Sequence, residues 1–230
     1  MALYTIGDLH LCLSVNKPMD IFGNKWVGYV EKLKSGFADL TDEDVTVICG
    51  DISWGMTLEE CREDFKFIDS LPGKKIILKG NHDYWWNTAN KIRHFFSENS
   101  IKSISILNNN SYVYDGMAIC GSRGWFYEEE KGAEHDKKIL NREVLRLRAS
   151  LDSAGDQEKI VFLHYPPICQ GYRCEQILEV LKEYNVRQCY YGHLHSKGCL
   201  SAFNGWTGGT EFHLISADFI DFKPVQVNRY

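Results

Sequence analysis

The sequence lacks the features that mark exported and membrane-bound proteins. None of its apolar runs approaches the length of a membrane span. Its first residues carry no basic stretch followed by a long apolar run, so nothing marks a secretory signal. With 5 prolines in 230 residues, no proline-rich linker, low-complexity segment or internal repeat divides the chain. We therefore expect a single cytoplasmic domain over residues 1–230, with no membrane partner.

An excess of positive charge is also missing. Lys and Arg number 26 against 31 Asp and Glu, which gives a formal net charge of −5. Proteins that bind nucleic acid or anionic membranes usually present a face rich in lysine and arginine. Nucleic acid is therefore not an expected partner, and a nuclease of this composition would need a local basic strip.

Cysteine is present, but not with the two-residue gap of zinc ribbons and redox motifs. Because the 8 cysteines occur in a chain without an export signal, we expect free thiols. Cys49, Cys120 and Cys189 stand inside apolar runs and are interpreted as small core residues. Cys169 and Cys174 form a close pair in polar surroundings, where burial is still favoured over a functional thiol.

Short runs rich in Val, Ile, Tyr and Phe predict the buried strands of the fold. They cover Leu3–Ile6, Val45–Cys49, Lys75–Lys79, Ile160–Leu163 and Gln188–Tyr191. Apolar residues three or four apart predict helices near Trp26–Leu33 and Phe65–Leu71, between the first three runs. Further helices are expected over Asp136–Ser153 and around Ile177–Leu181.

Turn signals in the second half of the chain predict hairpins. Asp115-Gly116 separates two alternating apolar stretches, and Asn204-Gly205 suggests a second turn of the same kind. Apolar residues near the end of the chain predict more strands: Phe212, Leu214, Ile215, Phe219, Ile220 and Phe222. Parallel units early and hairpins late favour an α/β fold in which two mixed sheets pack face to face with helices outside.

Polar residues with metal-ligand chemistry follow all five predicted strands, in the blocks Asp8-Leu9-His10, Gly50-Asp51, Gly80-Asn81-His82-Asp83, His164 and Gly192-His193-Leu194-His195. Functional groups of an open α/β sheet gather at the carboxyl ends of its strands, so these residues can converge on one crevice. Five of the 8 histidines occupy these positions. The other three, His94, His135 and His213, are expected to be surface or hydrogen-bonded residues.

The mixture of ligand types indicates which metals such a crevice would bind. Carboxylates, imidazoles and an amide oxygen form a nitrogen and oxygen set that suits Mn, Fe or Zn better than Ca or Mg. More candidate ligands exist than one ion needs. Two divalent ions about 3.5–4 Å apart, with Asp51 as a bridge, would use them all.

The five blocks resemble, in their order, the signature of the calcineurin-like metallophosphoesterase family, and they span nearly the whole chain. The resemblance implies a four-layer α/β/β/α sandwich. It implies one metal site formed by Asp8, His10, Asp51 and His195. It also implies a second site formed by Asp51, Asn81, His164 and His193.

The sequence departs from the family's common Gly-Asp-x-x-Asp block, because position 54 is Trp. The Ser/Thr protein phosphatases of this family carry an Arg shortly after that second Asp, and Ile52–Met56 supplies none. We therefore do not expect this chain to belong to the protein phosphatase subgroup.

The predicted reaction is hydrolysis of a phosphate mono- or diester by in-line attack of a hydroxide that bridges the two ions. His82 resembles the family's histidine that stabilises the transition state or protonates the leaving oxygen, and Asp83 could hold its imidazole. The alternative is that His82 only packs the turn. The expected substrate is a small phosphorylated molecule, with a nucleotide as one option.

Several residues near the strand ends are candidates for substrate binding. Trp54, Trp85 and Trp125 could stack a nucleobase, although aromatic residues beside turns more often cap the core. Arg123 could grip a phosphate or form a surface ion pair. The charged segment 128–138 could form a lid, but a solvated face is favoured there.

Two other functions compete with a small-molecule phosphohydrolase. A non-catalytic scaffold could keep the fold with a degraded metal site, but all seven ligand positions are intact here. A nuclease would need the basic surface that this chain lacks.

Overall fold

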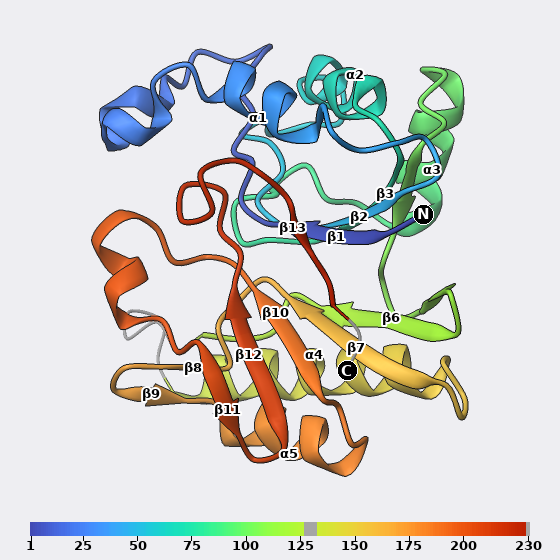
Figure 1. Cartoon of the computed structure of the whole chain (residues 1–230), viewed down its shortest axis with the longest axis vertical. Helices are drawn as coiled ribbons and strands as arrows, with labels where there is room; N and C mark the ends of the chain where they lie inside the picture. The colour runs from blue at the N-terminus through green and yellow to red at the C-terminus, as the bar shows by residue number, and fades with distance from the viewer. Residues whose placement is uncertain (127–132, 229–230) are drawn as a thin grey trace.

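Two β-sheets pack face to face at the centre of the computed structural model, which describes residues 1–126 and 133–228 (Figure 1). The first sheet has the strand order β13-β1-β2-β3-β4. Its β1 to β4 are parallel, and β13 pairs with β1 in the antiparallel direction. The strands cover Leu3–Ile6 (β1), Val45–Cys49 (β2), Lys74–Leu78 (β3), Ile104–Ile106 (β4) and Val225–Gln226 (β13).

The second sheet has the order β11-β12-β10-β7-β6-β5. Its four central strands are parallel, and the edge strands β11 and β5 are antiparallel to their neighbours. The strands cover Tyr112–Tyr114 (β5), Met117–Ser122 (β6), Glu158–Leu163 (β7), Gln188–Tyr191 (β10), Gly205–Thr207 (β11) and Thr210–Leu214 (β12). A separate two-stranded ribbon pairs β8 (Ile168–Cys169) with β9 (Tyr172–Arg173).

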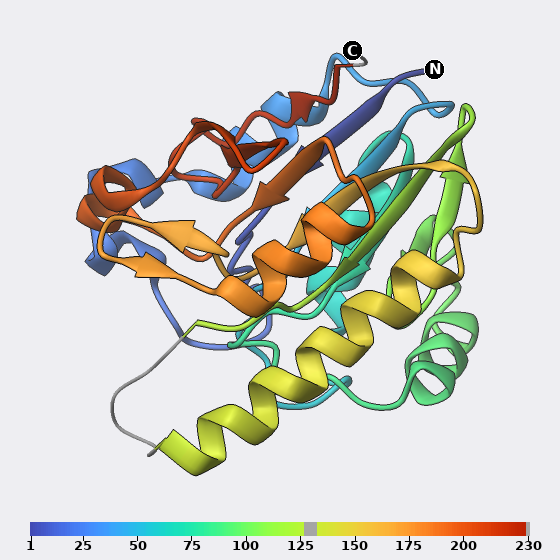
Figure 2. The ribbon, with the colours of Figure 1, turned by 90° about the horizontal axis from the view of Figure 1, so that it is seen from below.

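Helices cover the outer face of each sheet, as Figures 1 and 2 show from two directions. The first sheet carries α1 (Tyr29–Phe37), α2 (Arg62–Ser70) and α3 (Ala89–Glu98), and the second carries α4 (Ala133–Asp152) and α5 (Glu175–Glu183). Three short 3-10 segments complete the described structure: η1 (Met19–Phe22), η2 (Asn24–Trp26) and η3 (Ser196–Ser201). None of the helices that the structure describes is both long and apolar enough to cross a membrane.

The strands are apolar on both faces because each sheet is buried on both sides. In β2, Val47 packs between the two sheets, whereas its neighbour Ile48 packs against the helices. Phe162 of β7 belongs to the same cluster between the sheets as Val47 and is fully buried. Burial of a side chain of this size contributes about 1.5–3 kcal/mol. Continuous apolar runs with this burial are typical of parallel strands covered by helices.

The structure confirms the four-layer sandwich and all five strand predictions, with shifts of one or two residues at strand ends. The hairpin at Asp115-Gly116 is confirmed between β5 and β6, and both turn residues have positive φ angles of 47° and 81°. The helices expected near Phe65, Asp136 and Ile177 are confirmed as α2, α4 and α5. Cys49, Cys120 and Cys189 are buried as predicted.

Other predictions about the C-terminal region and the first helix are wrong. The turn between β11 and β12 is Gly208-Gly209, and Gly205 instead begins β11. Phe219, Ile220 and Phe222 lie in turns rather than strands. The helix expected from Trp26 begins at Tyr29, because Trp26 ends η2 and Gly28 adopts a left-handed conformation with φ 62°.

Candidate metal centre

All seven expected metal ligands lie in loops at the carboxyl ends of five parallel strands. Asp8 and His10 follow β1, Asp51 follows β2 and Asn81 follows β3 in the first sheet. The second sheet contributes His164 after β7 and His193 and His195 after β10. Both sheets therefore present ligands to one end of the sandwich.

The ligand loops are bonded to one another through their main chains. The Asp8 amide donates to the carbonyl of Gly50 at 3.0 Å, and the His10 amide donates to the carbonyl of Asp51 at 2.9 Å. Four of the seven residues have positive φ angles, with 59° at Asp8, 46° at His10, 49° at Asp51 and 73° at His193. This region costs a non-glycine residue roughly 1–2 kcal/mol. Such strain concentrates at functional sites, where the surrounding bonds hold it in place.

A first group of ligand atoms comes from Asp8, His10 and His195, which offer atoms within 4.8 Å of one another. His10 Nε2 lies 3.2 Å from His195 Nε2, and His195 Nε2 lies 3.4 Å from Asp8 Oδ1. The other ring nitrogen of His195, Nδ1, lies 2.8 Å from Asp218 Oδ1. Because that carboxylate accepts a hydrogen bond from Nδ1–H, Nε2 is the ring nitrogen that faces Asp8 and His10, and it can ligate a metal ion once it has lost its proton.

A second group comes from Asp8, Asp51 and His164, and Asn81 and His193 adjoin it. His164 Nδ1 donates to the carbonyl of Cys49 at 3.0 Å, which directs Nε2 toward the site. Asn81 Oδ1 lies 2.5 Å from His164 Nε2 and 3.0 Å from His193 Nδ1. Two imidazole nitrogens and an amide oxygen therefore face one point.

Asp51 lies between the two groups. Its Oδ2 is 3.7 Å from His10 Nε2 in the first group, and its Oδ1 is 3.6 Å from His164 Nε2 in the second. Oδ2 is buried and has no hydrogen-bond partner among the described residues. A buried carboxylate oxygen without a partner is costly, and a cation removes that cost. The donor set and this oxygen therefore fit bound divalent metal.

Ionisation in the site also favours a bound cation. Burial, and then the charge of Asp8, raise the pKa of Asp51. Burial lowers the pKa of His195, but Asp8 and Asp218 outweigh it and raise that pKa to about 10. Burial, and then His164, lower the pKa of His193 to about 3, so this ring is neutral and able to ligate. Without metal, the protonated His195 imidazole is the one positive charge among these residues that offsets the buried carboxyl groups. A bound cation would supply the positive charge instead.

Asp83 lies beside this centre but makes different contacts from those expected. Its fully buried carboxylate accepts hydrogen bonds from the amides of Asp51 at 2.9 Å, Ile52 at 2.8 Å and Gly80 at 2.7 Å. It also accepts one from the Trp85 indole at 3.0 Å. These bonds hold the loops that carry Asp51 and Asn81, and the expected pairing of Asp83 with His82 is not among them.

His82 and Trp54 line the mouth of the site. A pocket of about 300 Å³ is lined by Met19, Phe22, Trp26, Ser196 and these two residues, together with His10 and His195. Trp54 stacks on His10 with ring centroids 4.9 Å apart, and the His82 ring lies 4.5 Å from the Trp54 ring. Burial, then His164 and Lys17, lower the pKa of His82 to about 4. The His82 ring is therefore neutral at neutral pH.

The other candidate substrate residues lie away from this pocket. Trp85 is only 2% exposed, and its ring packs edge-on against Phe65 in the core. Trp125 is 6% exposed and borders a pocket beside α4. Arg123 pairs with Glu143 at 3.3 Å and lines a third pocket. Of the charged segment 128–138, for which a solvated face was favoured over a lid, residues 128–132 lie outside the described residues, and the rest begins α4.

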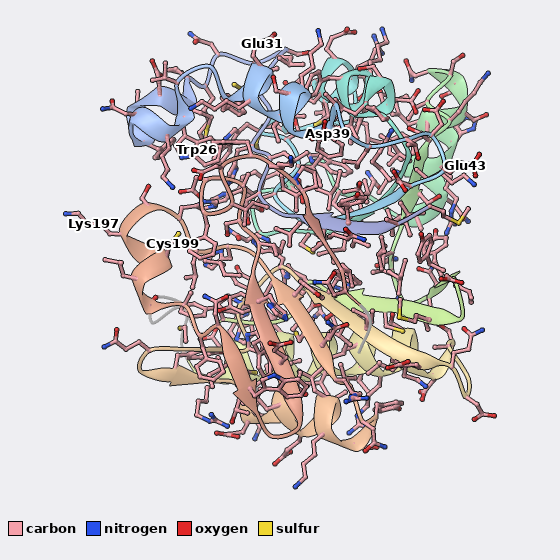
Figure 3. The ribbon with its side chains drawn as sticks, viewed as in Figure 1. Trp26, Glu31, Asp39, Glu43, Lys197 and Cys199 are labelled. Atoms are coloured by element: carbon pink, nitrogen blue, oxygen red, sulfur yellow. The ribbon has the colours of Figure 1, made fainter. Side chains whose placement is uncertain are left out.

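Two residues that the sequence reasoning missed contribute to the site. Asp218 orients His195 and is 2% exposed. Trp26, which was assigned only to a helix, contacts the His195 ring at 5.7 Å and lines the mouth pocket. Figure 3 shows Trp26 at the same edge of the sandwich as Lys197 and Cys199 of η3. A signal for Asp218 existed, because it follows β12 as the expected ligands follow their strands.

Comparison with solved structures supports the fold. The chain is similar to a phosphopantetheinyl hydrolase from Mycobacterium tuberculosis, with a TM-score of 0.60, 15% identity, and coverage of 100% of this chain and 96% of the other. It is also similar to a Thermus thermophilus protein, with a TM-score of 0.58, 13% identity, and coverage of 98% and 97%. Identities this low show a shared fold alone.

The sequence comparisons cover the residues of the candidate metal centre. The chain is 23% identical to a probable cyclic nucleotide phosphodiesterase of Xenorhabdus bovienii, over 97% of this chain and 96% of that protein. The family model described as calcineurin-like phosphoesterase matches residues 1–197, which include all seven expected ligands. The chain therefore belongs to the calcineurin-like phosphoesterase family and is a metal-dependent phosphoesterase.

Proposed function

We propose that this protein is a binuclear phosphohydrolase in which Asp51 bridges two divalent ions of Mn, Fe or Zn. The observation that carries the proposal is the position of the Asp51 carboxylate, with Oδ2 3.7 Å from His10 Nε2 and Oδ1 3.6 Å from His164 Nε2. The ligands divide accordingly into two sets. One comprises Asp8, His10, Asp51 and His195, and the other comprises Asp51, Asn81, His164 and His193.

When bound, the two ions supply positive charge that lowers the pKa of a water molecule and offsets the negative charge that develops on the phosphoryl oxygens. The chain positions the ligands through Asp218 and the Cys49 carbonyl, which fix the tautomers of His195 and His164. His82, at the rim of the mouth pocket, donates a ring N–H toward the phosphoryl or leaving oxygen. Asp83 acts on the reaction through the loops that it holds.

The proposed substrate is a phosphate ester of a small molecule, with a nucleotide phosphodiester as the leading candidate. The mouth pocket of about 300 Å³ is lined by Trp54, Trp26 and Phe22 directly above His10 and His195. Flat aromatic side chains of this kind stack nucleobases. The name of the Xenorhabdus bovienii relative, a probable cyclic nucleotide phosphodiesterase, supports the same substrate class.

The test is hydrolysis of chromogenic phosphate esters by protein stripped of metal with a chelator. A monoester, a diester and a cyclic nucleotide are offered after addition of Mn²⁺, Zn²⁺, Fe²⁺, Ni²⁺ or Mg²⁺. We expect metal-restored turnover that Asp51→Asn abolishes, because this change removes the bridging charge and almost no volume. Titration calorimetry should count two ions per wild-type chain and fewer in the variant. Near-wild-type turnover by Asp51→Asn would refute the bridging assignment.

A further inference from the structure

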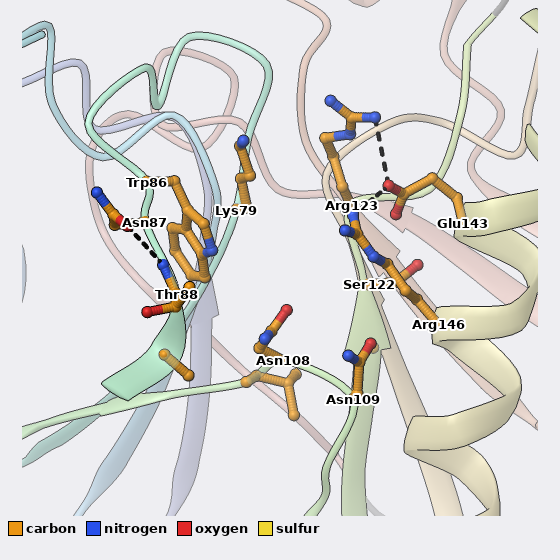
Figure 4. A pocket seen from close by; sticks show the side chains of 13 residues that line it. Lys79, Trp86, Asn87, Thr88, Asn108, Asn109, Ser122, Arg123, Glu143 and Arg146 are labelled. Carbon is orange, nitrogen blue, oxygen red and sulfur yellow. Dashed lines mark hydrogen bonds and ion pairs between the residues drawn. The ribbon is translucent and has the colours of Figure 1, made fainter. Parts of the chain in front are cut away.

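A second pocket, of about 440 Å³, opens between the two halves of the sandwich (Figure 4). Lys79, which follows β3, and Trp86 form one wall, and Arg123 and Arg146 form the opposite wall. Among the described residues that line this pocket, none belongs to the seven expected ligands or to the mouth pocket. It is therefore a different cavity from the candidate metal centre.

The charges in this pocket do not balance. Glu143, with a side chain only 1% exposed, lies between the two arginines, and its Oε1 is 2.7 Å from Arg146 Nη1 and 3.3 Å from Arg123 Nη2. Lys79 Nζ has no hydrogen bond or ion pair within the part of the chain that the structure describes. Three cations therefore face one carboxylate. A local excess of two positive charges stands out in a chain with a net charge of −5.

The arrangement of donors suits an oxyanion. Arg146 and Arg123 each use one terminal nitrogen for Glu143, so their other N–H groups remain for a ligand. Asn108 and Asn109 add side-chain amides at the floor of the cavity. Thr88 and Ala89, at the N-terminus of the ten-residue helix α3, line it as well, and that end of a helix carries partial positive charge.

We propose that this pocket binds the phosphoryl group of a small molecule, or free phosphate, at a site separate from the metal centre. A phosphate dianion matches the excess of two charges and offers oxygens to both arginines and to Lys79. Glu143 acts as the positioning residue, because it holds the two guanidinium groups on one wall opposite Lys79. The inference does not depend on the proposed reaction.

The experiment is calorimetric titration of chelator-stripped protein with inorganic phosphate, with AMP and with adenosine. Removal of metal takes away the ions through which the metal centre would hold phosphate. We expect saturable binding of phosphate or AMP, and about tenfold weaker binding in both Lys79→Gln and Arg146→Gln, because each loses a charge-assisted hydrogen bond. Lys102→Gln, which removes an exposed lysine elsewhere, is the matched control and should bind as the wild type does. Equal affinity for phosphate and AMP would identify free phosphate as sufficient, and tighter AMP binding would identify a phosphate ester.

Three results would overturn the proposal: no saturable anion binding, unchanged affinity in both Lys79→Gln and Arg146→Gln, or adenosine binding as tightly as AMP. The Asp51→Asn variant tests whether anion binding in this pocket is independent of the proposed reaction. That variant should bind the anion as the wild type does even though it is expected to lose turnover. If it too loses anion binding in metal-free protein, the pocket is not independent of the metal centre.

Discussion

Asp218 Oδ1 lies 2.8 Å from Nδ1 of His195, and Asp218 Oδ2 accepts a hydrogen bond from the Ser196 amide at 2.9 Å. The carboxylate is buried and fixes both the tautomer and the direction of the imidazole. His195 Nε2 consequently faces Asp8 Oδ1 at 3.4 Å. Asp218 thus shapes the metal centre without being one of its expected ligands.

Asp218→Asn is expected to weaken metal affinity about 10–100-fold, which is typical when the group that orients a histidine ligand is lost. The side-chain amide of Asn carries no negative charge, and its N–H₂ group would face either the His195 ring or the Ser196 amide, both of which donate to Asp218. Competition of Mn²⁺ against a fluorescent chelator measures the affinity. Asp221→Asn is the matched control, because Asp221 is an exposed residue three positions later. Equal Mn²⁺ affinity in Asp218→Asn and the wild type would show that His195 needs no such partner.

Asp83→Asn is expected to lower the free energy of unfolding by about 3 kcal/mol, because buried main-chain N–H groups of Asp51, Ile52 and Gly80 lose a charged acceptor. Urea unfolding in the presence of a chelator measures this loss apart from metal binding. Asp156→Asn, on an exposed turn, should leave stability unchanged. If Asp83→Asn instead keeps full stability and loses only turnover, Asp83 acts in the reaction through the His82 imidazole, as the sequence suggested, and not by holding the loops.

The strands and the metal centre could be predicted because each rests on a local pattern. Parallel strands buried on both faces must be apolar throughout, as Val47 and Ile48 show. The expected ligands follow those strands within a few residues, so finding the strands located the residues that converge at one end of the sandwich. The order of the blocks then identified the family, although no single block was specific.

Hydrophobicity predicts burial more reliably than it predicts conformation. Phe222 was assigned to a strand and is indeed 1% exposed, but it lies in a turn with φ 61° and packs against Trp26 at 5.2 Å. Likewise, Asn204-Gly205 and Gly208-Gly209 both favour turns. Only the pairing of β11 with β12 decides between them. The bonds of Asp83 to the Asp51 and Ile52 amides join residues 32 and 31 positions apart, and the bond between Asp218 and His195 joins residues 23 positions apart, so no local pattern could reveal these pairings.

Gly80→Ala is expected to disrupt the metal centre although it adds one methyl group. A Cβ at position 80 would overlap Oδ1 and the amide nitrogen of Asp51, so the proposed bridging residue would have to move. We expect at least tenfold weaker metal affinity and a matching loss of turnover. Gly198→Ala is the control, because its added Cβ would have no heavy atom within 4 Å. Normal metal stoichiometry and turnover in Gly80→Ala would show that Asp51 does not need its present position.

Lys75 is expected to make the free energy of unfolding increase with pH above 8. Its side chain is fully buried and donates to the carbonyls of Leu71 at 2.6 Å and Gly73 at 2.7 Å. Burial lowers its pKa from 10.5 to about 8, with partial compensation by Asp69 and Asp42. Between these two values the unfolded chain holds the Lys75 proton and the folded chain does not, so rising pH favours the folded state.

The contribution of Lys75 to the free energy of unfolding should therefore be constant below pH 8, rise by on the order of 3 kcal/mol up to pH 10.5, and level off above it. Urea unfolding of the wild type and Lys75→Met at pH 7.5, 9 and 10.5 isolates this term, since other groups titrate in both proteins. In Lys75→Met the carbonyls of Leu71 and Gly73 lose their donor at every pH. This loss changes the difference in unfolding free energy between the two proteins by the same amount at each pH. A difference between the two proteins that does not change with pH would show that Lys75 keeps its proton while buried.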